Sequence, residues 1–139
     1  MNPYAYSISL RFQHPSADLR ALMAILGLEP KHVWQAGEPR CTPKGTPLAG
    51  TRAESYWSAP VLSDEKLLSE VKALEDGLSE IVVRVAPFQA VFLRIRAEGG
   101  TAELFLGVFG DSNFGFEFSP ELLARVSALG LTLSFDIYP

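Results

Sequence analysis

The sequence predicts an α+β fold, a two-layer sandwich in which a mostly antiparallel sheet carries its helices on one face. Three observations predict it: segments that alternate large and small side chains, segments with apolar residues three and four positions apart, and the order of the two kinds along the chain. That order begins with the βαββαβ core of ferredoxin-like folds, and a further strand–helix–strand unit extends it toward the C-terminus. The sheet face without helices stays partly open, which makes it a natural surface for partners.

The first third of the chain contains a strand and a helix. Residues 4–12 alternate, which places five large side chains on one strand face: Tyr4, Tyr6, Ile8, Leu10 and Phe12. Ser16 is the expected N-cap of the following helix, and Gly27 is its expected left-handed end. The apolar stripe of that helix comprises Leu19, Leu22, Met23, Ile25 and Leu26.

A long connection separates the next two extended segments, residues 33–36 and 54–58. Residues 37–53 contain three prolines, three glycines and three threonines, a composition that resists both helix and sheet. We therefore expect an irregular loop there, and irregular loops of this length in compact domains are usually functional or disordered.

The remaining elements follow from caps and periodicity. Ser63 is the expected N-cap of a helix over 67–85, and a second helix over 88–95 begins after Pro87, with a strand over 91–95 as the alternative. Strands over 103–109 and 114–118 are expected to pair through a turn at 110–113. The chain then continues with a helix that opens at Ser119 and Pro120 and with a strand over 131–138.

Composition limits the class of protein. The 139 residues are 47% hydrophobic, which suits one domain, 1–139, whose core needs neither disulfide nor structural metal. The formal charge of −4 argues against nucleic-acid binding. Neither a signal-peptide pattern nor a membrane-length apolar run occurs, and the single cysteine, Cys41, fits a reducing compartment; we expect a cytoplasmic protein.

Motifs of catalysis and cofactor binding are missing from the sequence. The chain has no nucleophile elbow, zinc-protease motif, phosphate loop or dinucleotide fingerprint. His14 and His32 lack the companions of a tetrahedral metal site. Cys41 lies beside Arg40, and positive charge favours a thiolate, but neither histidine is placed by sequence as its base. We therefore assign no catalytic residue, no metal and no cofactor, and we favour a protein that is not an enzyme.

Positive charge gathers in one segment. Residues 30–52 contain four basic residues and one acidic residue, a net charge of +3, whereas the rest of the chain carries −7. Both tryptophans, Trp34 and Trp57, flank the loop over 37–53, and tryptophan beside arginine is typical of binding hot spots. The candidate binding residues are Trp34, Arg40, Lys44, Arg52 and Trp57. Since tryptophan on a short strand is often core, we expect Trp57 to be largely buried and Trp34 partly exposed.

A set of short motifs in a fixed order resembles the bacterial family classed as domain of unknown function 4279. The motifs are an opening strand, Leu26 to Pro30, Val33-Trp34 with Gly37, Pro43-Lys44-Gly45, Tyr56-Trp57, Glu103-Leu104 through Phe109, Ser119 to Leu123, and Asp136-Ile137-Tyr138. The resemblance spans nearly the whole chain. It implies a single-domain bacterial α+β protein and carries over no activity, cofactor or catalytic residue.

The leading hypothesis is a non-enzymatic interaction protein, similar in role to small bacterial immunity proteins that bind a toxin or other partner. The alternative is a small-ligand protein or cryptic enzyme in which Arg40, Lys44 and Arg52 hold an anion between Trp34 and Trp57. A third hypothesis is self-association through exposed strand edges across a two-fold axis.

Overall fold

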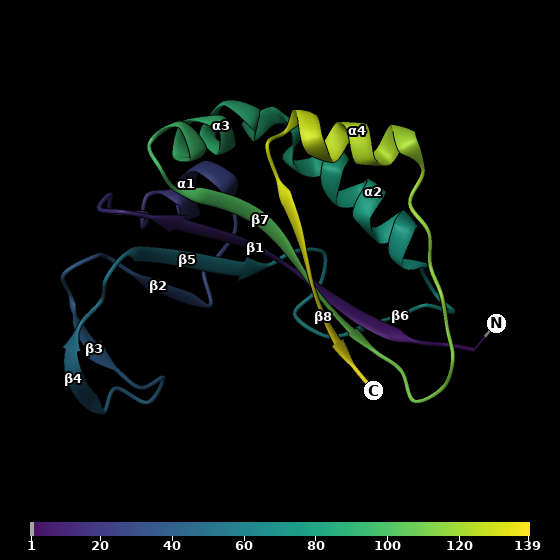
Figure 1. Cartoon of the computed structure of the whole chain (residues 1–139), viewed down its shortest axis with the longest axis horizontal. Helices are drawn as coiled ribbons and strands as arrows, with labels where there is room; N and C mark the ends of the chain where they lie inside the picture. Colours follow the sequence, from purple (N-terminus) through teal and green to yellow (C-terminus); the bar gives the residue numbers. More distant parts are fainter. Residues whose placement is uncertain (1) are drawn as a thin grey trace.

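A computed structural model describes residues 2–139, and its main sheet is mixed and carries the helices on one face (Figure 1). The sheet order is β2-β5-β1-β7-β8, and β6 pairs with the end of β1. All pairs are antiparallel except β7 with β8, which run parallel and are joined by α4. The strands are β1 (Ala5–His14), β2 (His32–Trp34), β5 (Ser55–Pro60), β6 (Leu67–Leu68), β7 (Thr101–Phe109) and β8 (Thr132–Tyr138).

The α+β class and the mostly antiparallel sheet are as predicted, but the strand order does not confirm the ferredoxin-like layout. The central strand β1 is antiparallel to both of its neighbours, β5 and β7. Among residues 2–139, the one parallel pair lies at an edge of the sheet and comes from the strand–helix–strand unit at the end of the chain.

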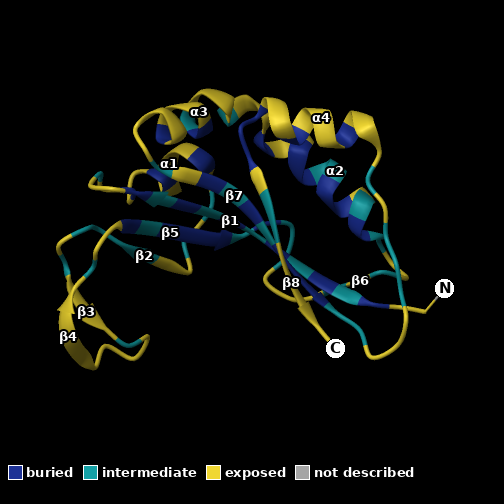
Figure 2. Ribbon diagram, viewed as in Figure 1, coloured by how far each residue is buried: buried dark blue, intermediate teal, exposed yellow. Residues whose placement is uncertain are grey.

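Alternation along β1 places the core. Its even-numbered side chains from Tyr6 to His14 are buried and face the helices, whereas its odd-numbered ones lie on the open face. Strand β7 continues the same pattern with Ala102, Leu104, Leu106 and Val108. Figure 2 shows this buried layer between the sheet and the helices. The strand predicted over 4–12 is therefore confirmed.

The helices are α1 (Leu22–Leu26), α2 (Leu74–Val85), the 3-10 turn η1 (Ala86–Phe88), α3 (Gln89–Ala97) and α4 (Pro120–Ala128). Helix α4 begins as predicted, because the Ser119 side chain accepts a hydrogen bond from the Leu122 backbone N–H at 3.1 Å. Helix α3 is also confirmed, and the alternative of a strand over 91–95 is wrong.

Two predicted helix starts are wrong. Helix α1 has only five residues, and its N-cap is Ala21 rather than Ser16. Helix α2 begins at Leu74 rather than near Ser63, because Leu67 and Leu68 instead pair with β1 as β6. Apolar spacing alone could not separate a helix from an extended segment at these places.

The segment 110–119 is another correction. No strand forms over 114–118; the segment is irregular and returns along the helix side of the sheet. Its aromatic side chains pack against other rings and form no strand pairing. Phe114 stacks on Tyr4 with 5.1 Å between ring centroids, and Phe116 and Phe118 stack on Phe135 at 5.9 and 6.1 Å. The aromatic content that predicted a strand therefore serves packing.

The predicted irregular loop over 37–53 is wrong as well. It forms a two-stranded antiparallel hairpin, β3 (Pro39–Cys41) and β4 (Pro47–Thr51), that pairs with no strand of the main sheet. Backbone hydrogen bonds between Arg52 and Gly37 and between Arg52 and Glu38 close its base. We call residues 39–51 the arm.

Candidate functional site

The arm stands on the side of the sheet away from the helices (Figure 1). Every residue of β3 and β4 is exposed, so the arm buries no strand residue in the core. It carries two positive charges, Arg40 and Lys44, and no acidic residue. Its apolar residue Leu48 is 44% exposed to solvent. Because an isolated two-stranded hairpin is only marginally stable in water, the fold of the arm depends on contacts at its base.

Those contacts form at Trp34, which lies at the end of β2. Its ring stacks on Tyr56 of β5 with 4.7 Å between centroids and a 22° interplanar angle. The guanidinium of Arg52 lies over the Trp34 ring, 3.7 Å from the centroid. Arg52 also donates from Nη2 to the Cys41 carbonyl at 3.1 Å, which ties the stack to β3. Trp34 and Arg52 are both half-buried, so Trp34 is partly exposed as predicted.

Arg40 and Lys44 lie in the arm itself. Arg40 donates from Nη1 to the Ala49 carbonyl on β4 at 3.3 Å, and both residues are exposed. Glu38, at the start of the arm, pairs with Arg20 and thereby connects it to the segment that precedes α1. Hydrogen bonding to Glu38 raises the pKa of Arg20.

Trp57 lies apart from the other four candidate residues. It is fully buried on the helix side of β5, where its ring lies 5.5 Å from that of Phe12. Its burial was predicted, but a fully buried side chain offers no surface to a ligand in this conformation. The structure thus joins Trp34 and Arg52 at the base of the arm, places Arg40 and Lys44 on the arm itself, and places Trp57 in the core.

The open sheet face beside the arm pairs other aromatic rings with cations. Arg11 lies over Phe105 at 4.1 Å and also pairs with Glu103. Lys66 lies over Phe109 at 3.8 Å. These rings are therefore covered by the chain's own cations.

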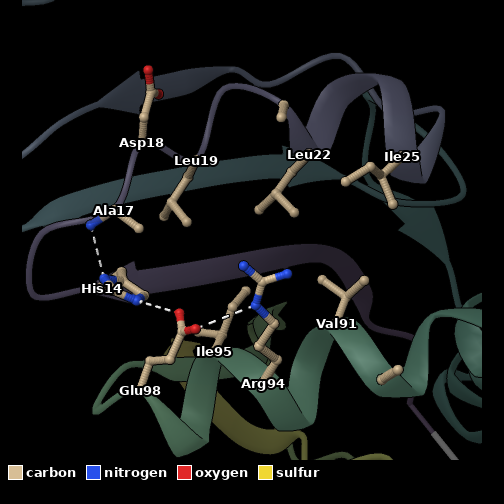
Figure 3. Close-up of a pocket in the computed structure, with 12 residues that line it drawn as sticks. His14, Ala17, Asp18, Leu19, Leu22, Ile25, Val91, Arg94, Ile95 and Glu98 are labelled. Atoms are coloured by element: carbon tan, nitrogen blue, oxygen red, sulfur yellow. Dashed lines mark hydrogen bonds and ion pairs between the residues drawn. The ribbon is translucent and has the colours of Figure 1, made fainter.

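A second candidate site, which the sequence prediction missed, is a cavity of about 320 Å³ between α1 and α3 (Figure 3). Apolar side chains line it from both sides, among them Leu19, Leu22 and Ile25 on one side and Val91 and Ile95 on the other. One end is polar and is formed by His14, Arg94 and Glu98.

His14 uses both of its ring nitrogens in hydrogen bonds. It is 5% exposed, and its Nδ1 accepts from the backbone N–H groups of Ser16 and Ala17 at 3.0 and 2.9 Å. Nε2 therefore carries the proton and donates to the Glu98 carboxylate at 2.8 Å. The other Glu98 oxygen accepts from Arg94 Nε at 3.2 Å. The bonds from His14 and then Arg94 lower the pKa of Glu98.

This arrangement bears on catalysis and metal binding. Both ring nitrogens of His14 are hydrogen-bonded within the fold, so neither is free to accept a proton from a substrate in this conformation. Cys41 is exposed on β3. Within residues 2–139, no three His, Cys, Asp or Glu side chains gather in a way that could hold a metal ion.

One local feature of the sequence, the spacing of Arg94 and Glu98, could have pointed to this second site, but apolar periodicity alone does not reveal it. Arg94 and Glu98 are four residues apart, the spacing of an ion pair on a helix face. His14 comes from the end of β1, more than eighty residues earlier, and only the fold brings it to Glu98.

Comparisons with known proteins returned one family. The model of a family described as "Domain of unknown function (DUF4279)" matches residues 4–139. Searches of curated proteins and of solved structures returned no match. Among residues 2–139, no helix is both long and apolar enough to cross a membrane.

Proposed function

The chain belongs to the DUF4279 family of domains of unknown function, and we propose that it is a non-enzymatic module that binds an acidic protein surface through its arm. The observation that carries this proposal is the arm itself: an ordered hairpin, exposed on every strand residue, that stands clear of the core.

The anchoring of the arm supports a binding role. Folding a hairpin costs conformational entropy, which buried apolar surface normally offsets. Here the offset comes from the stack of Tyr56, Trp34 and Arg52 and from the bonds that close the base. The result is a rigid display of Arg40, Lys44 and Leu48 to solvent, and preorganised loops bind with a smaller entropy cost.

The positive charge of the arm indicates what kind of surface its partner presents. The arm carries two cations and no carboxylate of its own, and the adjacent Glu38 is paired with Arg20, so the arm fits an acidic surface; exposed Leu48 adds an apolar contact on the same arm. The chain as a whole carries −4, which opposes long polyanions and favours a protein with a local acidic patch. An immunity-like role, in which that protein is a toxin, is one form of this function in the cytoplasm.

Affinity capture from the native host tests the proposal. The test variant is R40A/K44A. The matched control is R96A/R125A, which removes one exposed arginine from α3 and one from α4. We expect wild type and control to retain the same protein, the arm variant to lose it, and salt to release it. Equal recovery with both variants, or retention of nucleic acid alone, would contradict the proposal.

The small-anion alternative receives less support from the geometry. Arg40 and Arg52 donate to backbone carbonyls of the arm, and Arg52 covers the ring of Trp34. The anion site was expected between two tryptophans, and Trp57 lies in the core.

A second candidate function, self-association, is favoured by the edge strand β8. The Gly110 backbone N–H donates to the Tyr138 carbonyl, so the backbone groups of Tyr138 and of alternate residues before it face β7. The groups of Leu133, Phe135 and Ile137 face outward. No Lys, Arg or Pro interrupts residues 132–138, although such residues commonly protect sheet edges.

A two-fold axis at Phe135 would make this edge self-complementary. Leu133 would lie opposite the partner's Ile137, and Ser134 opposite the partner's Asp136, so that apolar meets apolar and no like charges face one another. The exposed fractions of Phe135 and Ile137, 41% and 54%, would fall on pairing.

Light scattering over a concentration series tests self-association. We expect a wild-type dimer at high concentration, a monomeric F135K variant, and an L123K control that still dimerises, since Leu123 is equally exposed but lies on α4. A wild-type protein that stays monomeric at every concentration would refute this function and leave the arm proposal untouched.

A further inference from the structure

We propose that the cavity between α1 and α3 binds a small carboxylate with an apolar body, whose carboxylate pairs with the guanidinium of Arg94 (Figure 3). This site is separate from the arm and from the β8 edge, and its occupant is a small molecule, so the proposal does not depend on either proposed function.

The walls of the cavity define the body of the ligand. Leu19 and Leu22 are buried and point into the cavity from the α1 segment, and Val91 and Ile95 face them from α3. Ile25 closes the far end and remains 50% exposed. An apolar body seated there would remove this surface from water, which is the main source of affinity in small-molecule pockets.

The volume sets the size of the ligand. The cavity measures about 320 Å³, and one methylene occupies about the space of one water molecule, roughly 30 Å³. A chain or ring system of about ten carbons fits.

Arg94 supplies the charge, and its neighbours hold it in place. Among residues 2–139 its side chain makes one hydrogen bond, from Nε to Glu98. The terminal nitrogens Nη1 and Nη2 point from α3 toward Leu19 and Leu22 (Figure 3). Two parallel N–H groups on one guanidinium match the two oxygens of a carboxylate.

Buried His14 completes the arrangement behind Arg94. Its Nε2–H donates to one Glu98 oxygen, which leaves the other to accept from Arg94 Nε. The carboxylate is thus bonded on both oxygens and orients the guanidinium, while Asp18, the other acidic residue of the lining, points away from the cavity. His14 and Glu98 are positioning residues, and Arg94 is the residue that contacts the ligand.

The test uses sodium decanoate and, as a probe of equal length and opposite charge, decylamine, both below their micelle concentrations. Titration calorimetry measures affinity, and backbone amide shifts in NMR locate the site. We expect decanoate to bind, decylamine to bind at least tenfold more weakly, and the shifts to gather on α1 and α3.

Three variants separate a specific site from general adsorption. R94Q should weaken decanoate binding about tenfold, since it removes a charged pair, and should leave the weak binding of decylamine unchanged. R96Q removes a neighbouring exposed arginine that does not line the cavity and should bind decanoate as wild type does. V91F should fill the cavity and block both probes.

Two results would overturn the proposal: equal binding of decanoate and decylamine, or an unchanged decanoate affinity in R94Q. The melting temperature of each variant shows that it is folded, so loss of binding in R94Q is not confused with loss of structure.

Discussion

The guanidinium of Arg52 lies 3.7 Å from the centroid of the Trp34 ring, and this contact joins the arm to the main sheet. Trp34 belongs to the edge strand β2 and rests on Tyr56, while Arg52 follows the last residue of β4. The cation and the ring thus couple two sheets that share no strand pairing. An arm whose strand residues are all exposed depends on this contact for its order.

Removal of the ring should release the arm without unfolding the domain. In W34A we expect backbone amides of residues 39–51 to exchange with solvent much faster, with global stability lowered by no more than about 2 kcal/mol, because Trp34 is only half-buried. Hydrogen-exchange mass spectrometry measures both quantities. The matched control, W57F, should lower global stability through the core and leave exchange in the arm unchanged. Unchanged exchange in W34A would show that the arm does not need this contact.

Gly77 is required on α2 because Tyr6 passes beneath it. A Cβ at Gly77 would lie 2.5 Å from the Tyr6 hydroxyl oxygen. We expect G77A to destabilise the protein by about 1 kcal/mol, since overpacking outweighs the gain in helix propensity. Y6F removes the nearest obstructing atom, at the cost of the hydrogen bonds from the Tyr6 hydroxyl to the Lys72 and Ala73 carbonyls, and G77A in that background should be neutral or stabilising.

Urea unfolding of the two single variants and the double variant measures this coupling. A coupling energy above about 1 kcal/mol is the expected result. Additive effects would mean that α2 moves away from β1 to accommodate the methyl group.

The Glu98 carboxylate makes the free energy of unfolding depend on pH in the acidic range. Its pKa in the folded protein lies below the ordinary value of 4.5, chiefly through the hydrogen bond from His14 and then that from Arg94. A lowered pKa contributes stability that is complete above about pH 4.5 and is lost as pH falls through the folded value. We expect the stability difference between wild type and E98Q to be constant near neutrality and to shrink below pH 4.5.

Thermal unfolding between pH 7 and pH 3 measures this difference. The control is E54Q, because Glu54 is exposed and forms no ion pair among the described residues. Parallel curves for wild type and E98Q down to pH 3 would contradict the assignment.

Ser119 caps α4, and Ser16 does not cap α1, although the sequence predicted both. S119A should lower stability by about 1 kcal/mol, because the Leu122 N–H then loses its acceptor. S16A should have almost no effect, since no hydrogen bond of the Ser16 hydroxyl forms among the described residues. Denaturant midpoints measure both variants, and an equal loss in the two would argue against a capping role at Ser119.

The sequence by itself determined the elements whose signals are local. Alternation from Tyr4 to Phe12 marked β1, because a strand with one buried face must repeat every two residues. Ser119 and Pro120 marked the start of α4, because capping and a preset φ act within one turn. The α+β class followed from these elements, as did the expectation that Trp57 would be buried and Trp34 partly exposed.

The tertiary structure alone decided which segments meet. Residues 37–53 have the composition of a loop, yet they pair because Trp34, supported by Tyr56 of β5, receives Arg52. Leu67 and Leu68 have helical spacing, yet they extend beside the end of β1. His14 reaches Glu98 only after β1 and α3 pack together. Periodicity reports the local backbone and the face of an element, whereas contacts between distant residues depend on how all the elements share one core, which no local window contains.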